Sequence, residues 1–196
     1  MPDPALHDDA GSKRERILDA ALALFAERGY HGTAVPLVAS AAGVGAGTIY
    51  RYFESKQGLV NELFRREKRA VTSHVLGSFP FAAAPRAQFH YFFERIVDWA
   101  RTHPSSFQFL EHHHHQPYLD DASRALEAEV TEYALNFVRM LKAAKIARDA
   151  DDHLFLVVVW GAIVRLMREA WSGRLELTDT LLAQAEEACW DAIEAG

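Results

Sequence analysis

The chain has 196 residues, which is enough for one or two domains and for a substantial buried core. Its composition, 49% hydrophobic and 24% charged, excludes wholesale disorder, and its single cysteine excludes a disulfide framework or a thiolate zinc site. The net charge of −6, taken alone, argues against a protein whose main partner is nucleic acid. The longest apolar run, eleven residues from Leu154 to Val164, is too short to cross a bilayer. With no signal-peptide pattern at the N-terminus, we expect a cytoplasmic protein without a membrane partner.

Helical periodicity runs through nearly the whole chain, and glycine or proline falls where the periodic segments end. Gly29 ends the first helix, Gly43 ends the second, and two prolines between Gly77 and Pro85 mark a loop in the middle of the chain. The sequence predicts helices over residues 12–28, 34–42, 46–53, 55–75, 86–102, 104–115, 120–147, 150–171 and 179–194. It shows no strand pattern, hairpin dipeptide or internal repeat, so we expect an all-α fold of about nine helices.

The charge is unevenly distributed along these helices. Residues 13–69 carry ten basic and six acidic side chains, a local charge of +4, whereas residues 70–196 carry eleven basic and eighteen acidic ones, a charge of −7. A weakly cationic first third joined to an acidic remainder indicates two functions in one chain. An excess of four charges is also common on a solvated face, so the charge alone does not show that the first third binds nucleic acid, and a motif is needed.

A helix-turn-helix pattern lies between Thr33 and Lys56, in the run TAVPLVASAAGVGAGTIYRYFESK. Ala39 lets two helices approach closely, Gly43 permits the turn between them, and Ile49 anchors the second helix. The short segment after the turn also gathers hydroxyl, aromatic and cationic side chains. Such a composition in so short a helix indicates that one of its faces is exposed and functional.

The run A-x-x-A-G-V-x-x-G-T-I-Y-x-Y-F-x-S-K-x-x-L, from Ala39 to Leu59, resembles the DNA-binding signature of the TetR (tetracycline repressor) family. The preceding ERGYHGT is similar to that family's link between its first two helices, whereas the later helices resemble the family only in number and length. The resemblance implies a dimeric transcription regulator, usually a repressor, that a small ligand releases from DNA. The implied regions are a flexible N-terminal tail over 1–11, a helix-turn-helix DNA-binding domain over 12–54, and a helical effector-binding and dimerisation domain over 55–196.

The resemblance also implies which residues meet DNA, with the short helix after the turn in the major groove. Tyr50, Tyr52 and Lys56 fall where the family contacts phosphates, and Thr33 would do so from the cap of the second helix. Arg51 is our candidate for base readout, because a guanidinium can bind guanine through two hydrogen bonds. The predicted DNA-binding residues are Thr33, Ala46, Gly47, Thr48, Tyr50, Arg51, Tyr52 and Lys56.

Three positions depart from the family pattern. Gly45 stands where Ser or Thr often caps the recognition helix, Ala46 replaces a residue that is frequently polar, and Pro36 would fall three residues past a Thr33 cap. Together with the weak positive charge, these departures predict a modest and salt-sensitive DNA affinity per subunit, so that specific binding needs the dimer.

Two groups of side chains near the motif have an alternative interpretation. Tyr50 and Tyr52 could be half-buried core aromatics instead of phosphate contacts. A cationic group on the following helix fits a solvated face better than a phosphate-binding patch; it consists of Arg65, Arg66, Lys68 and Arg69.

Aromatic side chains cluster between residues 89 and 110, where they fit either a core or the walls of a ligand cavity. In a TetR-like chain the central helices surround an effector. Apolar walls with a few polar aromatic groups favour a hydrophobic or aromatic ligand. The candidate effector residues are Phe92, Trp99, His113, His114, Tyr133 and Phe137.

The run from Glu111 to His115 contains four consecutive histidines, with His103 nearby. Successive side chains on a helix are ~100° apart, so only His112 or Glu111 can share a face with His115, and a third metal ligand must come from elsewhere. Pocket lining or polar surface is favoured, with a pH-responsive role as an alternative because histidine titrates near neutrality. We therefore predict no bound metal, no cofactor and no enzyme activity. The main rival is a helical metal-binding protein or hydrolase that uses the His112–His115 cluster, although no HExxH or nucleophile-elbow pattern supports it.

The segment from Leu154 to Met167 is apolar on almost every side, which fits a helix that is central in its own chain or shared with a partner subunit. The second interpretation is similar to TetR-family dimers, in which the last two helices of each subunit form a four-helix interface. Two recognition helices must also meet half-sites separated by about one turn of DNA or multiples of it, which requires a dimer. The candidate interface residues are Trp160, Ile163, Met167, Leu181 and Ala185.

Overall fold

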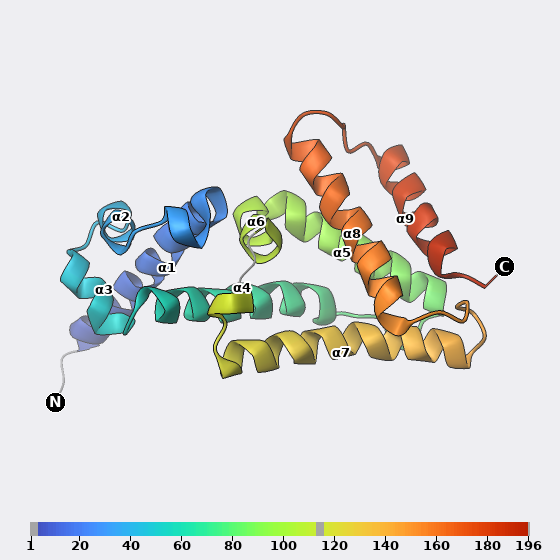
Figure 1. Ribbon diagram of the computed structural model, residues 1–196, viewed down its shortest axis with the longest axis horizontal. Coiled ribbons are helices and arrows are strands. Elements are labelled where there is room, and N and C mark those ends of the chain that lie inside the picture. Colours follow the sequence, from blue (N-terminus) through green and yellow to red (C-terminus); the bar gives the residue numbers. More distant parts are fainter. Residues whose placement is uncertain (1–3, 113–115, 196) are drawn as a thin grey trace. The chain divides into compact units, whose positions relative to one another are not determined.

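The computed structural model describes residues 4–112 and 116–195, with the side chains of residues 12–111 and 117–195. Its elements are α1 (Pro4–Gly32), α2 (Val35–Ala41), α3 (Ala46–Tyr52), α4 (Lys56–Leu76), α5 (Pro85–Thr102), α6 (Pro104–His112), the 3₁₀ turn η1 (Gln116–Tyr118), α7 (Asp121–Ala143), α8 (Asp152–Trp171) and α9 (Asp179–Ile193) (Figure 1). Within the described residues the single β pairing is an isolated bridge between Ala147 and Glu194. The prediction of an all-α fold of about nine helices is confirmed.

Two glycines in the left-handed region shape the helices of the first third. Gly29 has φ 69° and interrupts α1, and Gly43 has φ 66° and turns the chain after α2. Glycine adopts this conformation without the steric clash that a Cβ atom would make. The turns predicted at these two positions are therefore present.

Two other helix ends differ from the prediction. α1 begins at Pro4, so residues 4–11, predicted as part of a flexible tail, belong to a helix. Proline suits the first turn of a helix because its missing N–H would have no partner there anyway. α7 ends at Ala143 rather than near residue 147, because Lys145, with φ 58°, lies in the left-handed region and turns the chain.

The helices divide into two compact units. The first unit combines Met1–Ala70 with His103–Leu126 and so contains α1 to α3, most of α4, α6 and the start of α7. The second unit combines Val71–Thr102 with Glu127–Gly196 and so contains the end of α4, α5, most of α7, α8 and α9. The unit boundary lies inside α4, beyond the expected domain boundary after residue 54, because apolar side chains of α4 complete the core of the first unit.

The core of the first unit is built from five helices. α1 packs against α2 and α6, and α2 packs against α3. The rings of Phe25 on α1 and Phe109 on α6 have centroids 6.4 Å apart, so an aromatic residue from the middle of the chain belongs to this core. Its most buried side chains include Ile17, Leu18, Ala21, Phe25, Val38, Ala39, Ile49, Phe53, Leu59, Leu63, Phe109 and Leu119.

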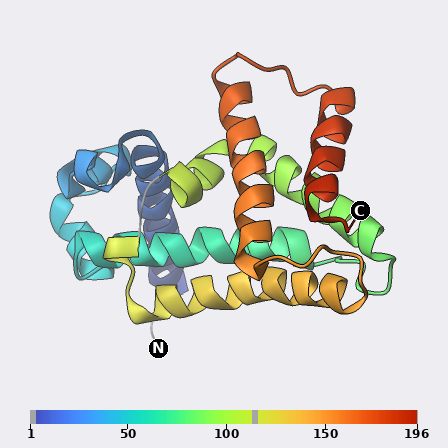
Figure 2. The ribbon, with the colours of Figure 1, turned by 45° about the vertical axis from the view of Figure 1, so that its right-hand side comes forward.

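In the second unit, α8 packs against α9, and α5 contacts both (Figure 2). The rings of Phe89 on α5 and Trp190 on α9 have centroids 5.3 Å apart. Beside them, the buried carboxylate of Glu186 on α9 is hydrogen-bonded to Arg86 and His90 of α5. Aromatic packing and a buried ion pair therefore hold these two helices together.

Candidate nucleic-acid interface

The α2–turn–α3 segment forms a helix-turn-helix on the core of the first unit. Across the turn, the backbone N–H of Val44 donates to the carbonyl oxygen of Ala39 at 2.9 Å, and Gly43 supplies the left-handed conformation. Ala39 and Ile49 are 3% and 1% exposed, as expected for the close contact and the anchor of the motif. Because Ile49 is buried, it fixes which side of α3 faces outward.

α3 presents a polar face to solvent. Tyr50 is 55% exposed, so its alternative interpretation as a core aromatic is wrong. Tyr52 is half-buried beside Phe53, with ring centroids 6.4 Å apart, and part of its surface remains accessible. The other predicted contacts of this helix are Ala46, Gly47 and Arg51, which are exposed, and Thr48, which is half-buried.

The helices of this region differ in how their N-termini are capped. Gly45 is the N-cap of α3 and offers no side-chain hydrogen bond, as expected for glycine. The hydroxyl of Ser55 accepts a hydrogen bond from the backbone N–H of Gly58 at 3.0 Å and caps α4. α2 has Ala34 as its N-cap and Pro36 in its first turn, where the missing N–H is tolerated.

The prediction that Thr33 caps α2 is wrong. Thr33 is completely buried, and its hydroxyl donates to the carbonyl oxygens of Leu24 at 3.1 Å and Gly29 at 2.9 Å, both in α1. The end of a helix leaves carbonyl oxygens without intrahelical partners, and Thr33 supplies a donor where Gly29 interrupts α1. A side chain with no exposed surface does not reach a phosphate, so Thr33 leaves the set of DNA-contact candidates.

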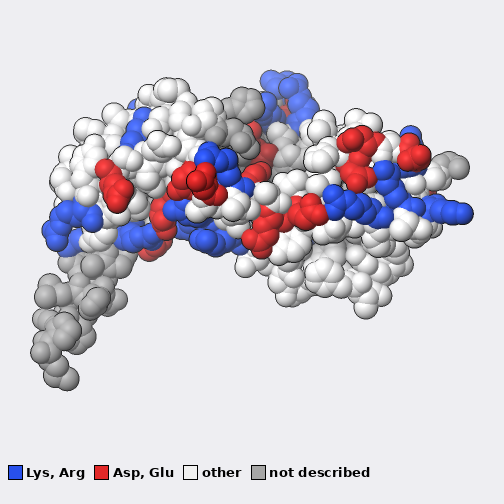
Figure 3. All heavy atoms as spheres, turned by 60° about the horizontal axis from the view of Figure 1, so that its bottom comes forward, with Lys and Arg blue, Asp and Glu red and all other residues white. Residues whose placement is uncertain are grey.

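Several cations of the first unit are held in ion pairs. One guanidinium nitrogen of Arg65 donates to both carboxylate oxygens of Asp120, at 3.0 and 2.9 Å, and another donates to Glu62 at 2.9 Å. Arg66 likewise pairs with carboxylates of α1 and α4. These two arginines form a bonded network rather than a freely solvated face. On the face drawn in Figure 3, Lys and Arg side chains are interspersed with Asp and Glu.

Lys56, the first residue of α4, lies beside an aromatic ring of α1. Its Nζ atom is 4.2 Å from the ring centroid of Tyr30, within the range of a cation–π contact. Partial burial lowers the pKa of the Lys56 ammonium below its ordinary value. This predicted phosphate contact is thus held against α1 instead of being freely solvated.

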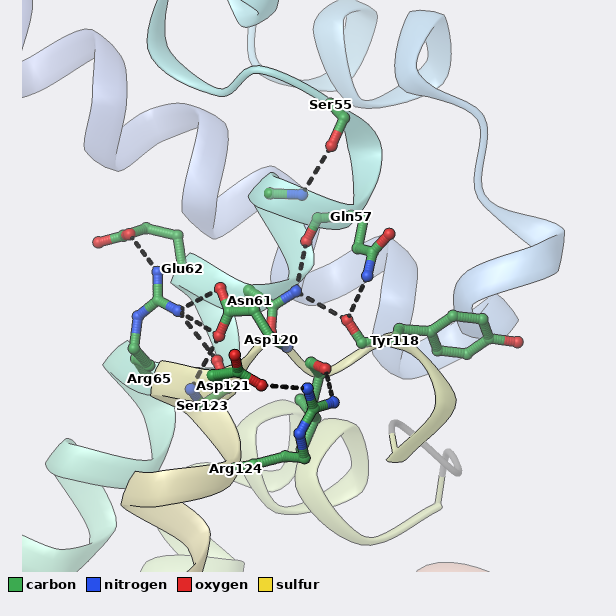
Figure 4. Close-up of polar contacts among 12 residues, drawn as sticks. Ser55, Gln57, Asn61, Glu62, Arg65, Tyr118, Asp120, Asp121, Ser123 and Arg124 are labelled. Carbon is green, nitrogen blue, oxygen red and sulfur yellow. Dashed lines mark hydrogen bonds and ion pairs between the residues drawn. The ribbon is translucent and has the colours of Figure 1, made fainter.

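A polar cluster joins α4 to the connection between α6 and α7, and the sequence analysis missed it (Figure 4). The amide of Asn61, 1% exposed, donates to the carbonyl oxygen of Tyr118 and accepts from the backbone N–H of Asp120, each at 2.8 Å. Burial by itself would raise the pKa of the Asp120 carboxyl, but hydrogen bonds from Ser123 and Arg65 outweigh it and hold the pKa below its ordinary value. One sequence feature could have indicated this cluster: Asn61 is a polar residue at a buried position of an amphipathic helix, and a buried amide needs hydrogen-bond partners.

The aromatic candidates for an effector site differ in burial. Trp99 is 7% exposed, and its ring centroid lies 5.2 Å from that of His74. Phe92 and Phe137 are half-buried, and the ring of Phe92 lies 6.5 Å from that of Phe89. These residues belong to the second unit and contribute to its apolar interior.

The polar candidates for that site are Tyr133, His113 and His114, and the structure describes the side chain of Tyr133 among them. Tyr133 is 48% exposed, and its hydroxyl donates to Glu129 on the same helix at 3.1 Å, which raises the pKa of the tyrosine. His113 and His114 lie outside the described residues, as do the side chains of His112 and His115. Among the side chains that the structure describes, no group of three or more His, Cys, Asp or Glu is placed to hold a metal ion.

α8 leaves an apolar face open. Ile163 and Met167, predicted to line a dimer interface, are completely buried in their own chain, and this part of the prediction is corrected. Trp160, Leu181 and Ala185 are half-buried. The outward-facing large apolar side chains of α8 are Leu154, Val157 and Val158, which are 50%, 68% and 41% exposed. α8 is nevertheless not a membrane span, since no helix in the described part of the chain has the length and apolar character to cross a bilayer.

Family profiles match both parts of the chain. The profile described as bacterial regulatory proteins of the tetR family matches residues 17–63, and the tetracyclin repressor-like C-terminal domain matches residues 64–195. The HTH-type transcriptional repressor KstR2 of Mycobacterium tuberculosis is 33% identical over 115 residues, which cover 58% of this chain and 52% of that protein. The chain therefore spans about half the length of this curated relative.

Solved structures match over nearly the full chain. A TetR family transcription regulator of Marinobacter aquaeolei VT8 has a TM-score of 0.86 at 24% identity, over 98% of this chain and 100% of that one. A TetR family protein of Vibrio parahaemolyticus has a TM-score of 0.76 at 27% identity, over 94% of this chain and 100% of that one. The all-α fold and its helix order are thus shared with proteins of this kind.

Proposed function

The chain belongs to the TetR family of bacterial regulatory proteins, and from this premise we propose that it is a DNA-binding transcriptional repressor that acts in the cytoplasm as a homodimer. The observation that carries the proposal is the polar face of α3, which the buried Ile49 and the left-handed Gly43 hold outward. The relative named as a transcriptional repressor supports repression as the mode of action. The family is one of regulators, so the protein is not an enzyme.

In the proposed complex α3 lies in the major groove of the operator. The guanidinium of Arg51 reads a guanine, and Thr48 contacts a neighbouring base edge. Tyr50, Tyr52 and Lys56 bind phosphates on either side of the groove and set the register of the helix without reading sequence.

The dimer is proposed to form through the open face of α8 together with α9. An exposed stripe of large apolar side chains on a helix is costly in water and marks an interaction surface. The two recognition helices then face half-sites related by the same two-fold axis as the subunits. Binding of both half-sites compensates for the weak positive charge of each subunit.

We also propose that a small hydrophobic or aromatic effector binds the second unit and releases the repressor from DNA. The aromatic interior of that unit, which includes Phe89, Phe93 and Trp99, supports a ligand of this class. α4 contributes residues to both units. A movement of α4 caused by effector binding would therefore reach the helix-turn-helix. The coupling cannot exceed the effector's differential affinity for the two states, ~1–3 kcal/mol in typical cases.

The proposal is tested by an electrophoretic mobility shift with DNA from beside the protein's own gene. Arg51→Ala is expected to weaken specific binding at least tenfold, since the proposed dimer loses two bidentate base contacts of ~1–3 kcal/mol each. Arg69→Ala is the matched control, because it removes the same charge from an exposed position of α4 outside the proposed contacts. Absence of a specific shift, or equal binding by both variants, would contradict the proposed role of α3.

A further inference from the structure

We propose that Tyr118, on η1, is a positioning residue for the DNA contact made by Lys56, and that it acts through the ring of Tyr30. The inference depends on the proposed function in one respect only: that Lys56 binds a phosphate. The positioning itself concerns three side chains of the first unit and can be tested without DNA.

The three side chains are in direct contact although they come from distant parts of the sequence. The rings of Tyr30 and Tyr118 are stacked, with centroids 4.0 Å apart and planes inclined by 18°. The Nζ atom of Lys56 lies 4.2 Å from the centroid of the same Tyr30 ring. Tyr30 thus touches both the cation at the start of α4 and the aromatic residue of η1.

Tyr118 is itself held firmly on α4 (Figure 4). Its carbonyl oxygen accepts hydrogen bonds from the side-chain amides of Gln57 at 2.9 Å and Asn61 at 2.8 Å. Its hydroxyl is hydrogen-bonded to Nε2 of His31, the neighbour of Tyr30 in the chain. Gln57 directly follows Lys56, so the same turn of α4 carries the phosphate contact and the group that fixes Tyr118.

Tyr30 directly follows Gly29, whose non-helical conformation interrupts α1. A regular helix would fix the direction of the Tyr30 side chain, but the backbone at this interruption fixes it less. Stacking by Tyr118, at a centroid distance of 4.0 Å, is the closest ring contact of Tyr30 and, together with Phe25 at 6.3 Å, restricts the Tyr30 ring to one orientation. A restricted ring restricts the ammonium that contacts it, and the Lys56 side chain then loses less rotamer freedom when it meets a phosphate. The ammonium has three N–H donors, so a ring contact leaves donors for a phosphate oxygen.

Two variants separate stacking from a general structural role. Tyr118→Phe loses the bond to His31 but keeps the stacked ring and the two bonds to α4, so its Lys56 resonances should match those of the unchanged protein. Tyr118→Leu removes the ring and should release Tyr30 and Lys56. Should Tyr118→Leu fail to fold by circular dichroism, Tyr118→Met, whose side chain is longer and more adaptable, takes its place.

The first measurement is NMR of protein labelled with ¹³C-lysine, in the absence of DNA. The Hε resonances of Lys56, assigned through Lys56→Arg, should be shifted upfield by the Tyr30 ring in the unchanged protein and in Tyr118→Phe. In Tyr118→Leu they should move toward the values of solvated lysine, while those of Lys68, whose Nζ lies 5.6 Å from the Phe64 ring, should not move. An unchanged Lys56 shift in Tyr118→Leu would overturn the positioning role, whether or not the protein binds DNA.

The second measurement is the salt dependence of binding to a duplex of arbitrary sequence, between about 50 and 200 mM KCl. Lys56→Gln removes one phosphate contact per subunit, so the steepness of log K against log [salt] should fall by about 1.8 per dimer. Tyr118→Leu leaves the ammonium in place, so it should weaken binding at every salt concentration while losing less of this steepness. The double variant should bind no more weakly than Lys56→Gln alone, because Tyr118 acts only through Lys56. Affinity losses that add in the double variant, or unweakened binding by Tyr118→Leu, would contradict the inference, whereas no DNA binding by the unchanged protein would contradict the proposed function instead.

Discussion

Two buried polar side chains, Thr33 and Asn61, hold irregular backbone of the first unit. Thr33 donates to carbonyl oxygens on the last turns of α1, around the interruption at Gly29. Asn61 donates to Tyr118 and accepts from Asp120, the two residues that lead into α7. Leaving a buried polar group without its partner costs ~1–3 kcal/mol, so both side chains fix the conformation of their segments as well as stabilising them.

We predict that Thr33→Val lowers the free energy of unfolding by ~1–3 kcal/mol, because the carbonyl oxygens of Leu24 and Gly29 lose the donor that they share while the volume is retained. The slope of DNA affinity against salt should stay unchanged, since Thr33 contacts no phosphate. Urea unfolding and a salt titration of DNA binding measure the two quantities. Thr131→Val is the control: its hydroxyl donates within α7 to Glu127, and its change should stay within ~0.5 kcal/mol. A lowered salt slope in Thr33→Val would restore Thr33 as a phosphate contact.

At the same scale, the sequence identified the anchor of the motif but not these two polar residues. Ile49 and Gly43 could be predicted because their roles depend on neighbours a few residues away. Asn61 bonds backbone some sixty residues further along, which no local pattern encodes. Thr33 bonds Leu24 and Gly29 nearby, but the resemblance assigned it to the following helix instead of to the end of α1. The sequence therefore places Thr33 on the wrong helix and omits Asn61 altogether.

Among the elements, the bounds of α4, α5 and α8 were predicted closely, but the buried face of α8 was not. α4 and α5 show the periodicity of a buried stripe, and their bounds lie close to the predicted ones. α8 is apolar all round, so the pattern does not distinguish the buried Ile163 and Met167 from the exposed Val157. Only the packing of α8 against α9 and α5 shows which of its apolar side chains stay exposed.

The contact between α5 and α9 is predicted to weaken in acid through Glu186. Burial would raise the pKa of this carboxyl, but hydrogen bonds from Arg86 and His90 hold it below its ordinary value of 4.5. A carboxyl with a depressed pKa contributes its full stability above the ordinary pKa and loses it as the pH falls through the folded-state pKa. The free energy of unfolding should therefore fall below pH ~4.5.

Glu186→Gln should be less stable than the unchanged protein by ~1–3 kcal/mol at pH 7, because Arg86 loses a buried partner. It should also lose less stability on acidification. Glu187→Gln is the control, since Glu187 forms an ion pair with the same arginine at an exposed position. This change should lower the free energy of unfolding by less than ~1 kcal/mol. Urea unfolding at pH 7 and pH 3.5 compares them, and equal acid sensitivity of both variants and the unchanged protein would refute this assignment.

At the scale of the whole molecule, the net charge of −6 does not exclude DNA binding, because its acidic residues lie mostly beyond residue 69. The positive charge available to DNA is also smaller than the number of Lys and Arg side chains suggests. Arg14, Arg65 and Arg66 are paired with carboxylates of the first unit, which leaves fewer cations for phosphate. Each subunit should thus bind DNA weakly, and the proposed dimer should supply the affinity.

We predict that Val157→Glu prevents dimerisation, because it places a charge on the open apolar face of α8. Light scattering coupled to gel filtration should find monomers where the unchanged protein forms dimers, and DNA affinity should fall with it. Phe81→Glu is the control: Phe81 is 73% exposed in the loop before α5, and the variant should remain dimeric. A dimeric Val157→Glu would show that a different face joins the subunits.

The most direct test of the account is the ratio of two affinities, measured at one salt concentration: that for DNA from beside the protein's own gene and that for an arbitrary duplex of equal length. A repressor that reads bases through α3 should prefer the first by ~10³-fold or more, and Arg51→Ala should reduce this ratio while leaving binding to the arbitrary duplex nearly unchanged. Equal affinity for the two duplexes, or a preference that Arg51→Ala does not alter, would contradict the claim that the exposed face of α3 recognises an operator.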